Sequence, residues 1–150
     1  MKLTIPVNGQ TKVIPFAIEY TDAEKRRQLI TLDNAIEFEL NVSLKIEKRN
    51  RYRDLGSQLY KDENSMPSER HKMFREAVKV GLKAIHGVTE EDMANLQWDG
   101  DEVPDKVLDQ LAEVRIPFYD NLIDWLGMEI ISANTPSMDQ LKNFVLQSTQ

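Results

Sequence analysis

The two histidines are the side chains best suited to acid–base or metal chemistry, because the chain has no cysteine. Without cysteine, disulfides, thiolate nucleophiles and cysteine-based zinc or iron–sulfur sites are excluded. His71 and His86 fall in a segment that we expect to be one helix, where they would lie about 22 Å apart along the axis, too far to share a metal ion. We expect His71 to be exposed near the start of this helix. We expect His86 to lie in its last turn, where the helix dipole favours a positive charge.

No other set of residues points to catalysis. The sequence has no nucleophile-elbow serine from which a triad could be assembled, and no glycine-rich phosphate-binding loop. We therefore expect no catalytic residues, no cofactor and no metal site. An enzyme ranks behind the other functional classes considered below.

An acidic cluster has the residue types of a calcium-binding loop: Asp99-Gly100-Asp101-Glu102, with Asp105 close behind. An EF-hand requires acidic ligands at alternate positions, glycine at the sixth position and glutamate at the twelfth, whereas here glycine directly follows the first aspartate. We interpret the cluster as a turn followed by the acidic start of a helix, with at most weak binding of divalent cations.

A basic run with Tyr52 inside it consists of Lys45, Lys48, Arg49, Arg51 and Arg53. Arginines that alternate with an aromatic ring can follow phosphates and stack on a base. However, Glu47 and Asp54 flank the run, and a nucleic-acid-binding domain is usually basic as a whole. We favour a solvated strand end or loop that docks onto an acidic surface.

Charge is divided unequally along the chain. Residues 1–86 contain 16 lysines and arginines against 12 acidic residues, whereas residues 87–150 contain 3 against 13, within a formal net charge of −6. Such a division bears on partners and association, not on chemistry. It predicts a binding protein with weak, salt-sensitive self-association. The candidate partner-binding residues are Lys48, Arg49, Arg51, Tyr52 and Arg53 on the basic side, and Trp98, Asp99, Asp101, Glu102 and Asp105 on the acidic side.

The two tryptophans have different predicted roles. Trp125 continues a helical apolar stripe and is expected in the core. Trp98 precedes a turn, where it could pack at the core edge or serve as an interface anchor, a role in which tryptophan is enriched.

Length and composition favour one domain, residues 1–150, with a core of its own. Hydrophobic residues make up 41% of the chain and charged residues 29%, as in ordinary globular proteins. The N-terminus has too short an apolar run for a signal peptide, and no stretch approaches the roughly 20 apolar residues of a membrane span. We expect no membrane association and a cytoplasmic location.

The N-terminal part should form strands. Residues 2–7 and 12–20 alternate in polarity around Asn8-Gly9, which suits a tight hairpin turn. Thr21 to Glu24 has capping-box spacing and predicts a short polar helix as far as Ile30. In residues 36–46, every second side chain is apolar, which favours a half-buried strand with Phe38 and Val42 inward and Glu39 and Ser43 outward. A helix that is apolar on two sides is the alternative for this segment.

The remainder predicts helices, apart from residues 47–65, which we interpret as a loop or mobile hairpin, with a short helix near residues 54–60. A helix should run from Pro67 to a glycine cap at Gly87. One face of this helix is apolar and should point inward: Met73, Phe74, Ala77, Val78, Gly81, Leu82 and Ile85. Thr89 should cap a short acidic helix. A long helix with a kink at Pro117 should extend from near Pro104 through Trp125, and a last helix should begin at Ser137. The predicted fold is therefore α+β: a small antiparallel sheet, a hairpin plus one long strand, packed against a mainly helical C-terminal half.

Two segments resemble the tail assembly chaperones of long-tailed bacteriophages. The first runs from Leu3 to Gln10 with its Asn8-Gly9 turn, followed by Pro15-Phe16; the second runs from Ile85 to Asp92, followed by Asp99-Gly100 and a helix. Together they cover about a fifth of the chain. Residues 36–46 depart from the family, which tends to be helical there, and the basic run has no counterpart. The resemblance implies a non-enzymatic protein that binds tape-measure and tail-tube subunits.

The sequence thus favours a protein that scaffolds or chaperones other proteins. The alternative is a nucleic-acid-associated regulator, in which the arginine run binds phosphate or the acidic half imitates it. Nucleic acid is the less favoured partner because the chain as a whole is acidic.

Overall fold

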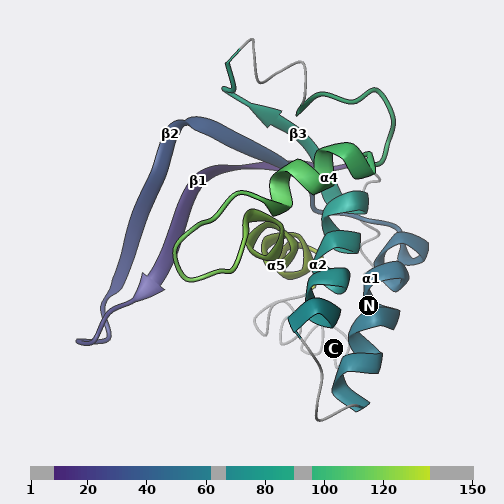
Figure 1. The fold of residues 1–150 in the computed structure, drawn as a ribbon, viewed down its shortest axis with the longest axis horizontal. Coiled ribbons are helices and arrows are strands. Elements are labelled where there is room, and N and C mark those ends of the chain that lie inside the picture. The colour runs from purple at the N-terminus through teal and green to yellow at the C-terminus, as the bar shows by residue number, and fades with distance from the viewer. Residues whose placement is uncertain (1–8, 62–66, 90–95, 136–150) are drawn as a thin grey trace, which may run out of the picture.

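The computed structural model describes residues 9–61, 67–89 and 96–135, in which three strands and four helices follow one another. They are β1 (Thr11–Thr21), β2 (Arg27–Asn41), α1 (Ile46–Lys61), α2 (Pro67–Gly81), β3 (Leu82–His86), α4 (Asp105–Ala112) and α5 (Leu122–Ala133). The strands form one antiparallel sheet in the order β1-β2-β3. Figure 1 shows a long, bent β1–β2 hairpin on one side and the helices on the other, with α5 nearest the hairpin. The α+β class predicted from the sequence is confirmed.

The segment after β1 is a hairpin turn, and the predicted polar helix up to Ile30 is wrong. The carboxylate of Asp22 accepts hydrogen bonds from the backbone N–H groups of Glu24 and Arg26, both at 2.9 Å, and Lys25 adopts a positive φ of 63°. An aspartate that satisfies the backbone of its own turn competes with helix formation. These hydrogen bonds also lower the pKa of the Asp22 carboxyl, and the one from Arg26 has the largest effect. Desolvation acts in the opposite direction.

Strand β2 confirms the predicted alternation only as far as Asn41. Phe38 and Leu40 are each 1% exposed, which excludes the two-sided helix for this part of the chain. Residues 42–45 leave the sheet and α1 begins at Ile46, so the predicted strand ends too late. The hairpin bends where its register shifts on both sides of Phe16, because extra β2 residues bulge there. Gly87 packs against this bulge, since a Cβ there would lie 1.7 Å from the carbonyl oxygen of Ala35.

Helix α1 replaces the loop or mobile hairpin predicted from residue 47 as far as residue 61, and it contains the short helix predicted near residues 54–60. Residues 62–65 of that prediction lie outside the described residues. Few side chains of α1 are apolar, but Tyr52 is only 2% exposed and Gly56 is buried beside Met73 of α2. Packing of α1 against α2 therefore stabilises a helix whose own sequence has a weak amphipathic pattern.

Helix α2 has the predicted inner face, but it ends at Gly81 instead of Gly87. Ala77, Val78 and Val80 are fully buried, and the chain then continues as β3, with Ile85 opposite Phe38 of β2. On the side away from β1, strand β2 has backbone N–H and C=O groups that need hydrogen-bond partners, and residues 82–86 can provide them only as a strand, not as a continuation of α2. Residues 82–86 therefore form an edge strand, and Gly87, with a φ of 82°, follows that strand.

The long helix predicted from Pro104 to Trp125 is two helices. Between α4 and α5, Ile116 and Tyr119 form a β-bridge around a tight turn at Pro117. Phe118 has a positive φ of 68°, is 66% exposed and stacks on Tyr20 of β1. Asn121 caps the N-terminus of the second helix, α5, because its side chain accepts a hydrogen bond from the N–H of Asp124 at 3.1 Å.

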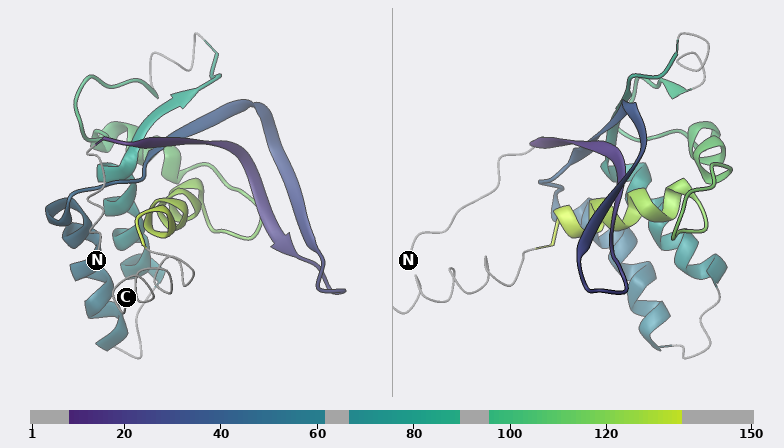
Figure 2. Two further views of the ribbon diagram at one scale, coloured as in Figure 1. Left: turned by 180° about the vertical axis from the view of Figure 1, so that it is seen from behind. Right: turned by 90° about the vertical axis from the view of Figure 1, so that its left-hand side faces the viewer.

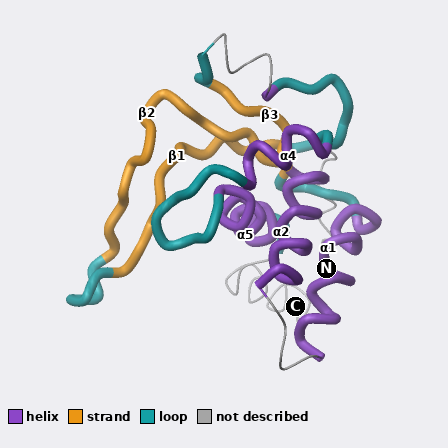
Figure 3. The backbone as a smooth tube through the Cα atoms, in the orientation of Figure 1, coloured by secondary structure: helices purple, strands orange, loops and turns teal. Residues whose placement is uncertain are grey.

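A single cluster of buried side chains joins the sheet to α2, α4 and α5. At its centre, three aromatic rings pack against one another, those of Phe16, Phe38 and Trp125, with ring centroids 5.3–5.8 Å apart. This confirms the predicted core position of Trp125. Helices α2 and α5 cross closely, because a Cβ on Gly127 would lie 2.6 Å from the Cβ of Phe74. Figure 2 shows the hairpin and the helices from two further sides, and Figure 3 separates strands from helices by colour.

Three predicted elements lie outside the described residues: the strand at residues 2–7, the short helix after Thr89 and the helix that begins at Ser137. Within the described part of the chain, no helix combines the length and apolar character needed to cross a membrane.

Candidate functional site

Helix α1 distributes the predicted basic residues over different faces. Tyr52 is buried, so its ring cannot stack on a base as the sequence suggested. Arg51 faces α2 and the segment before α4, whereas Arg49 and Arg53 line a groove on another side. Lys48 is half-buried, and the described residues offer it no ion pair.

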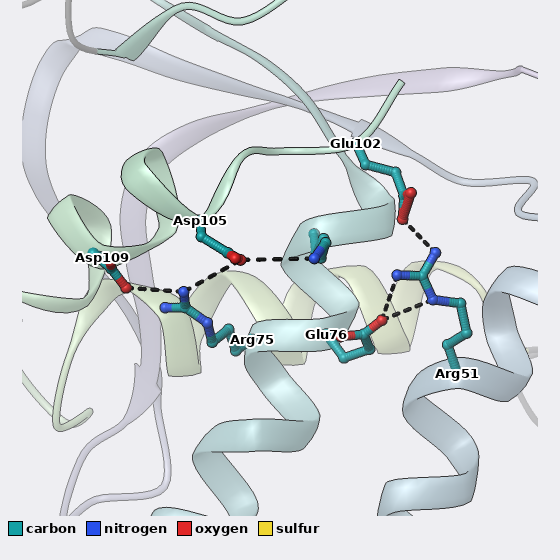
Figure 4. A network of polar contacts seen from close by, with 7 residues as sticks. Arg51, Arg75, Glu76, Glu102, Asp105 and Asp109 are labelled. Carbon is teal, nitrogen blue, oxygen red and sulfur yellow. Dashed lines mark hydrogen bonds and ion pairs between the residues drawn. The ribbon is translucent and has the colours of Figure 1, made fainter. Parts of the chain in front are cut away.

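On the Arg51 side, an ion-pair network joins the basic and acidic halves of the chain (Figure 4). The Arg51 guanidinium lies 2.6 Å from a Glu76 carboxylate oxygen and also pairs with Glu102. Burial tends to lower the pKa of Arg51, but the hydrogen bonds that Arg51 donates to Glu102 and Glu76, together with the negative charges of these carboxylates, outweigh this effect and raise it. In the same network, Asp105 lies 3.5 Å from Arg75 and 3.6 Å from Lys79.

The fold therefore brings oppositely charged segments that lie far apart in sequence into contact. Of the predicted acidic site residues, Glu102 and Asp105 are engaged within the chain, while Asp99 and Asp101 are exposed. Trp98 is half-buried against the core, which agrees with a position at its edge. The ten predicted residues do not form one continuous surface.

Neither histidine fully matches its prediction. His71 lies near the start of α2, as predicted, but it is half-buried instead of exposed, with Nδ1 2.8 Å from a carboxylate oxygen of Asp124 on α5. His86 ends β3 instead of a helix, with Nε2 3.2 Å from a carboxylate oxygen of Glu39. Across the described residues, no group of three or more histidine, aspartate or glutamate side chains is arranged to hold a metal ion.

A groove with a volume of about 850 Å³ is bounded by α1, α2 and α5, and we call it the helix groove. Each helix contributes residues spaced three or four apart, the spacing of one helical face. Its lining consists of Arg49, Tyr52, Arg53, Gly56 and Ser57 from α1, Arg70, Met73 and Phe74 from α2, and Met128, Ile131, Ser132, Asn134 and Thr135 from α5 and the residues after it. Helix α2 packs against both α1 and α5 and forms the floor.

Among the described residues, the charge of the helix groove is entirely positive. Three arginines and no carboxylate of this part of the chain line it, and none of the three, Arg49, Arg53 and Arg70, has an ion pair there. The Nε atom of Arg49 is buried and makes no hydrogen bond there. A buried donor without a partner is a free-energy cost that an incoming acceptor would remove.

Asn134 fixes the wall of the groove where α5 ends. Its amide accepts a hydrogen bond from the N–H of Leu44 and donates to the carbonyls of Asn41 and Ile130, all at 2.9 Å. These bonds tie the end of α5 to the segment that leads into α1. The groove is therefore preformed by the fold.

Sequence reasoning identified Arg49, Tyr52 and Arg53 but not the apolar part of the groove. Met73 and Phe74 were assigned to the inner face of a helix, yet both are only partly buried. Met128 is 44% exposed and Ile131 is half-buried. The sequence did contain a signal for the groove, namely arginines and methionines at helical spacing. Only the fold shows that these residues, which come from three helices, line the same groove.

A second cavity, of about 400 Å³, lies between the sheet and α4, and the described residues of its lining include no charged side chain. Val88 and Leu96 line it, and these residues flank positions 90–95, outside the described ranges.

Comparisons with known proteins find no matching family model, no similar protein among those of curated function and no similar solved structure.

Proposed function

We propose that this protein is a non-enzymatic assembly chaperone or scaffold that holds a helix of another protein in the helix groove. The observation that carries the proposal is a preformed recess in which α2 and α5, which crosses it, present apolar side chains, while α1 adds an arginine-bearing edge. A helix of another protein can pack its side-chain ridges against those of the helices that bound this recess.

The composition of the groove supports protein binding. Methionine, aromatic residues and arginine are enriched at protein interfaces, and methionine adapts its flexible side chain to different partners. The exposure of Met128 in a helix that is otherwise largely buried is in keeping with this role.

We further propose phage tail assembly as the setting, on the strength of the two resembling sequence segments. The partners would then be tape-measure or tail-tube subunits in the cytoplasm of a bacterial host. Weak self-association is part of the same proposal.

Site-specific photo-cross-linking of the full-length chain tests this function. A photoreactive amino acid at Ser132, which is exposed in the groove, should cross-link to purified tape-measure or tail-tube protein encoded beside this chain. The same label at Glu113, exposed outside the groove, serves as the matched control. Equal labelling from both positions, or none from Ser132, would contradict the proposal.

The nucleic-acid alternative retains one supporting observation, the three arginines without ion pairs. It loses the stacking platform, because Tyr52 is buried, and it leaves an apolar floor without a role. Imitation of nucleic acid by the acidic half is also less favoured, since Glu102, Asp105 and Asp109 pair with arginines of the same chain.

A further inference from the structure

We infer that the segment held in the helix groove is an acidic amphipathic helix, with carboxylates in a row along one edge of its apolar stripe. This inference rests on the proposed function and adds the chemistry of the partner. It follows from the position of the charges within the groove, which are confined to α1 and α2.

The three arginines form a row along the groove. Arg51 contacts Glu76, and Gly56 lies beside Met73, so α1 and α2 run antiparallel. In this register Arg70 continues the row beyond Gly56, at a level close to Ser57. Counting from Arg49, the row spans about eight helical residues, or about 12 Å.

The opposite wall carries no charge among the residues that the structure describes. Helix α5 and the residues after it contribute Met128, Ile131, Ser132, Asn134 and Thr135 to the lining. A helix that fits both walls therefore needs apolar residues toward α5 and toward Met73 and Phe74 of the floor, with acidic residues toward α1 and the Arg70 end of α2. Carboxylates four residues apart on the partner match Arg49 and Arg53, which are themselves four residues apart on α1.

Arginine is well suited to this contact. Its planar guanidinium can pair with a carboxylate through two hydrogen bonds, and it is weakly hydrated, which favours burial at an interface. Nucleic acid would satisfy the charges but would place a polar backbone over Met73, Phe74 and Ile131.

The test uses synthetic helical peptides and fluorescence anisotropy with the full-length chain. The probe is an 18-residue peptide with leucines at helical spacing on one face and three glutamates four residues apart on one edge. Otherwise identical peptides carry glutamine or lysine in place of the glutamates, and a labelled oligothymidine of similar length represents nucleic acid. We expect the glutamate peptide to bind at least 10-fold more tightly than the lysine peptide, with a difference that shrinks as salt rises.

Matched variants assign the effect to the row. R49E/R53E/R70E should reverse the preference, so that the lysine peptide binds more tightly. R26E/R27E/R115E has the same change in net charge at exposed positions, where Arg26 and Arg27 form only surface ion pairs, and should leave the preference intact. Thermal unfolding by circular dichroism shows whether each variant is folded.

Several results would overturn the inference. Equal affinity for the glutamate and glutamine peptides would show that the groove takes helices without regard to charge, which leaves the proposed function standing. No binding of any peptide would refute the inference, while cross-linking from Ser132 would still decide the function. Tighter binding of oligothymidine than of the glutamate peptide, lost in R49E/R53E/R70E, would assign the row to nucleic acid.

Discussion

Two faces of α1 use the same type of residue in opposite ways. Arg51 faces Glu76 and Glu102 and joins the basic half of the chain to the acidic half (Figure 4). Arg49 and Arg53, two positions away on either side, face the helix groove and have no ion pair within the described residues. A paired arginine contributes to the stability of the fold, whereas an unpaired one beside an apolar recess is available for a partner.

Helix α2 shows the same division. Arg75, Glu76 and Lys79 belong to the ion-pair network, while Arg70, Met73 and Phe74 line the groove. The comparison therefore separates residues that should matter for stability from those that should matter for binding, and mutations can test each side.

The close crossing of α2 and α5 holds the groove together, so its disruption should have the largest effect. Gly127→Val should destabilise the protein by about 3 kcal/mol, the upper end for overpacking, because the new side chain would meet the backbone of Phe74. Gly100→Val is the matched control, since a Cβ at Gly100 meets no atom closer than 4.0 Å. Urea unfolding measures both, and a loss at Gly127 no larger than at Gly100 would show that the helices are not in tight contact.

Breaking the network should cost less. Glu76→Gln should lower the free energy of unfolding by about 1–2 kcal/mol, because Arg51 loses a charged hydrogen-bond partner in a partly buried setting. Arg53→Gln should change it by less than about 0.5 kcal/mol, since that arginine has no ion pair within the described residues. If denaturation gave the two variants the same stability, the distinction between the faces of α1 would be wrong.

Glu129 is a third kind of charged residue, a half-buried carboxylate of α5 without an ion pair among the described residues. Burial raises the pKa of Glu129; Lys12 opposes this and Glu19 adds to it. Between the ordinary value of 4.5 and the raised value, the folded state binds more protons than the unfolded state, so stability falls as pH rises through that window. Above the window the full cost remains.

Glu129→Gln should therefore stabilise the protein modestly at pH 7, by less than Glu76→Gln destabilises it. The difference from the natural chain should vanish below pH 4.5, where the carboxyl is protonated in both states. Thermal melts across this pH range measure it, with the exposed Glu113→Gln as control. A gain that persists at low pH would point to a cause other than charge burial.

The apolar side of the groove should have the smallest effect on stability. Met128→Ala should change the free energy of unfolding by less than about 0.5 kcal/mol, because this side chain is 44% exposed. The same variant should weaken binding of the glutamate peptide several-fold if Met128 contacts it. A large loss of stability without a loss of binding would make Met128 a structural residue.

Local patterns predicted the elements whose own side chains suffice to define them. Phe38 and Leu40 alternate with polar residues and lie in a strand, because alternate positions along a strand share one face. The buried face of α2 and the core position of Trp125 followed in the same way from helical spacing. The absence of cysteine also excluded disulfides, thiolate nucleophiles and cysteine-based metal sites, without any knowledge of the fold.

Other parts depended on neighbours distant in the chain. Residues 82–86 continue the apolar spacing of α2 but form β3, because the edge of β2 offers them backbone partners. Helix α1 is mostly polar and is stabilised by its contacts with α2. The turn at Asp22 matched a capping box, yet its carboxylate satisfied a hairpin instead.

The sequence by itself determined the α+β class, the inward positions of β2 and α2, and the presence of an arginine-rich segment opposite in charge to the second half of the chain. Only the tertiary structure decided which arginines are neutralised within the chain and which face a groove. The physical reason is that charge pairing depends on distances between side chains such as Arg51 and Glu102, 51 residues apart in sequence, which packing alone brings together.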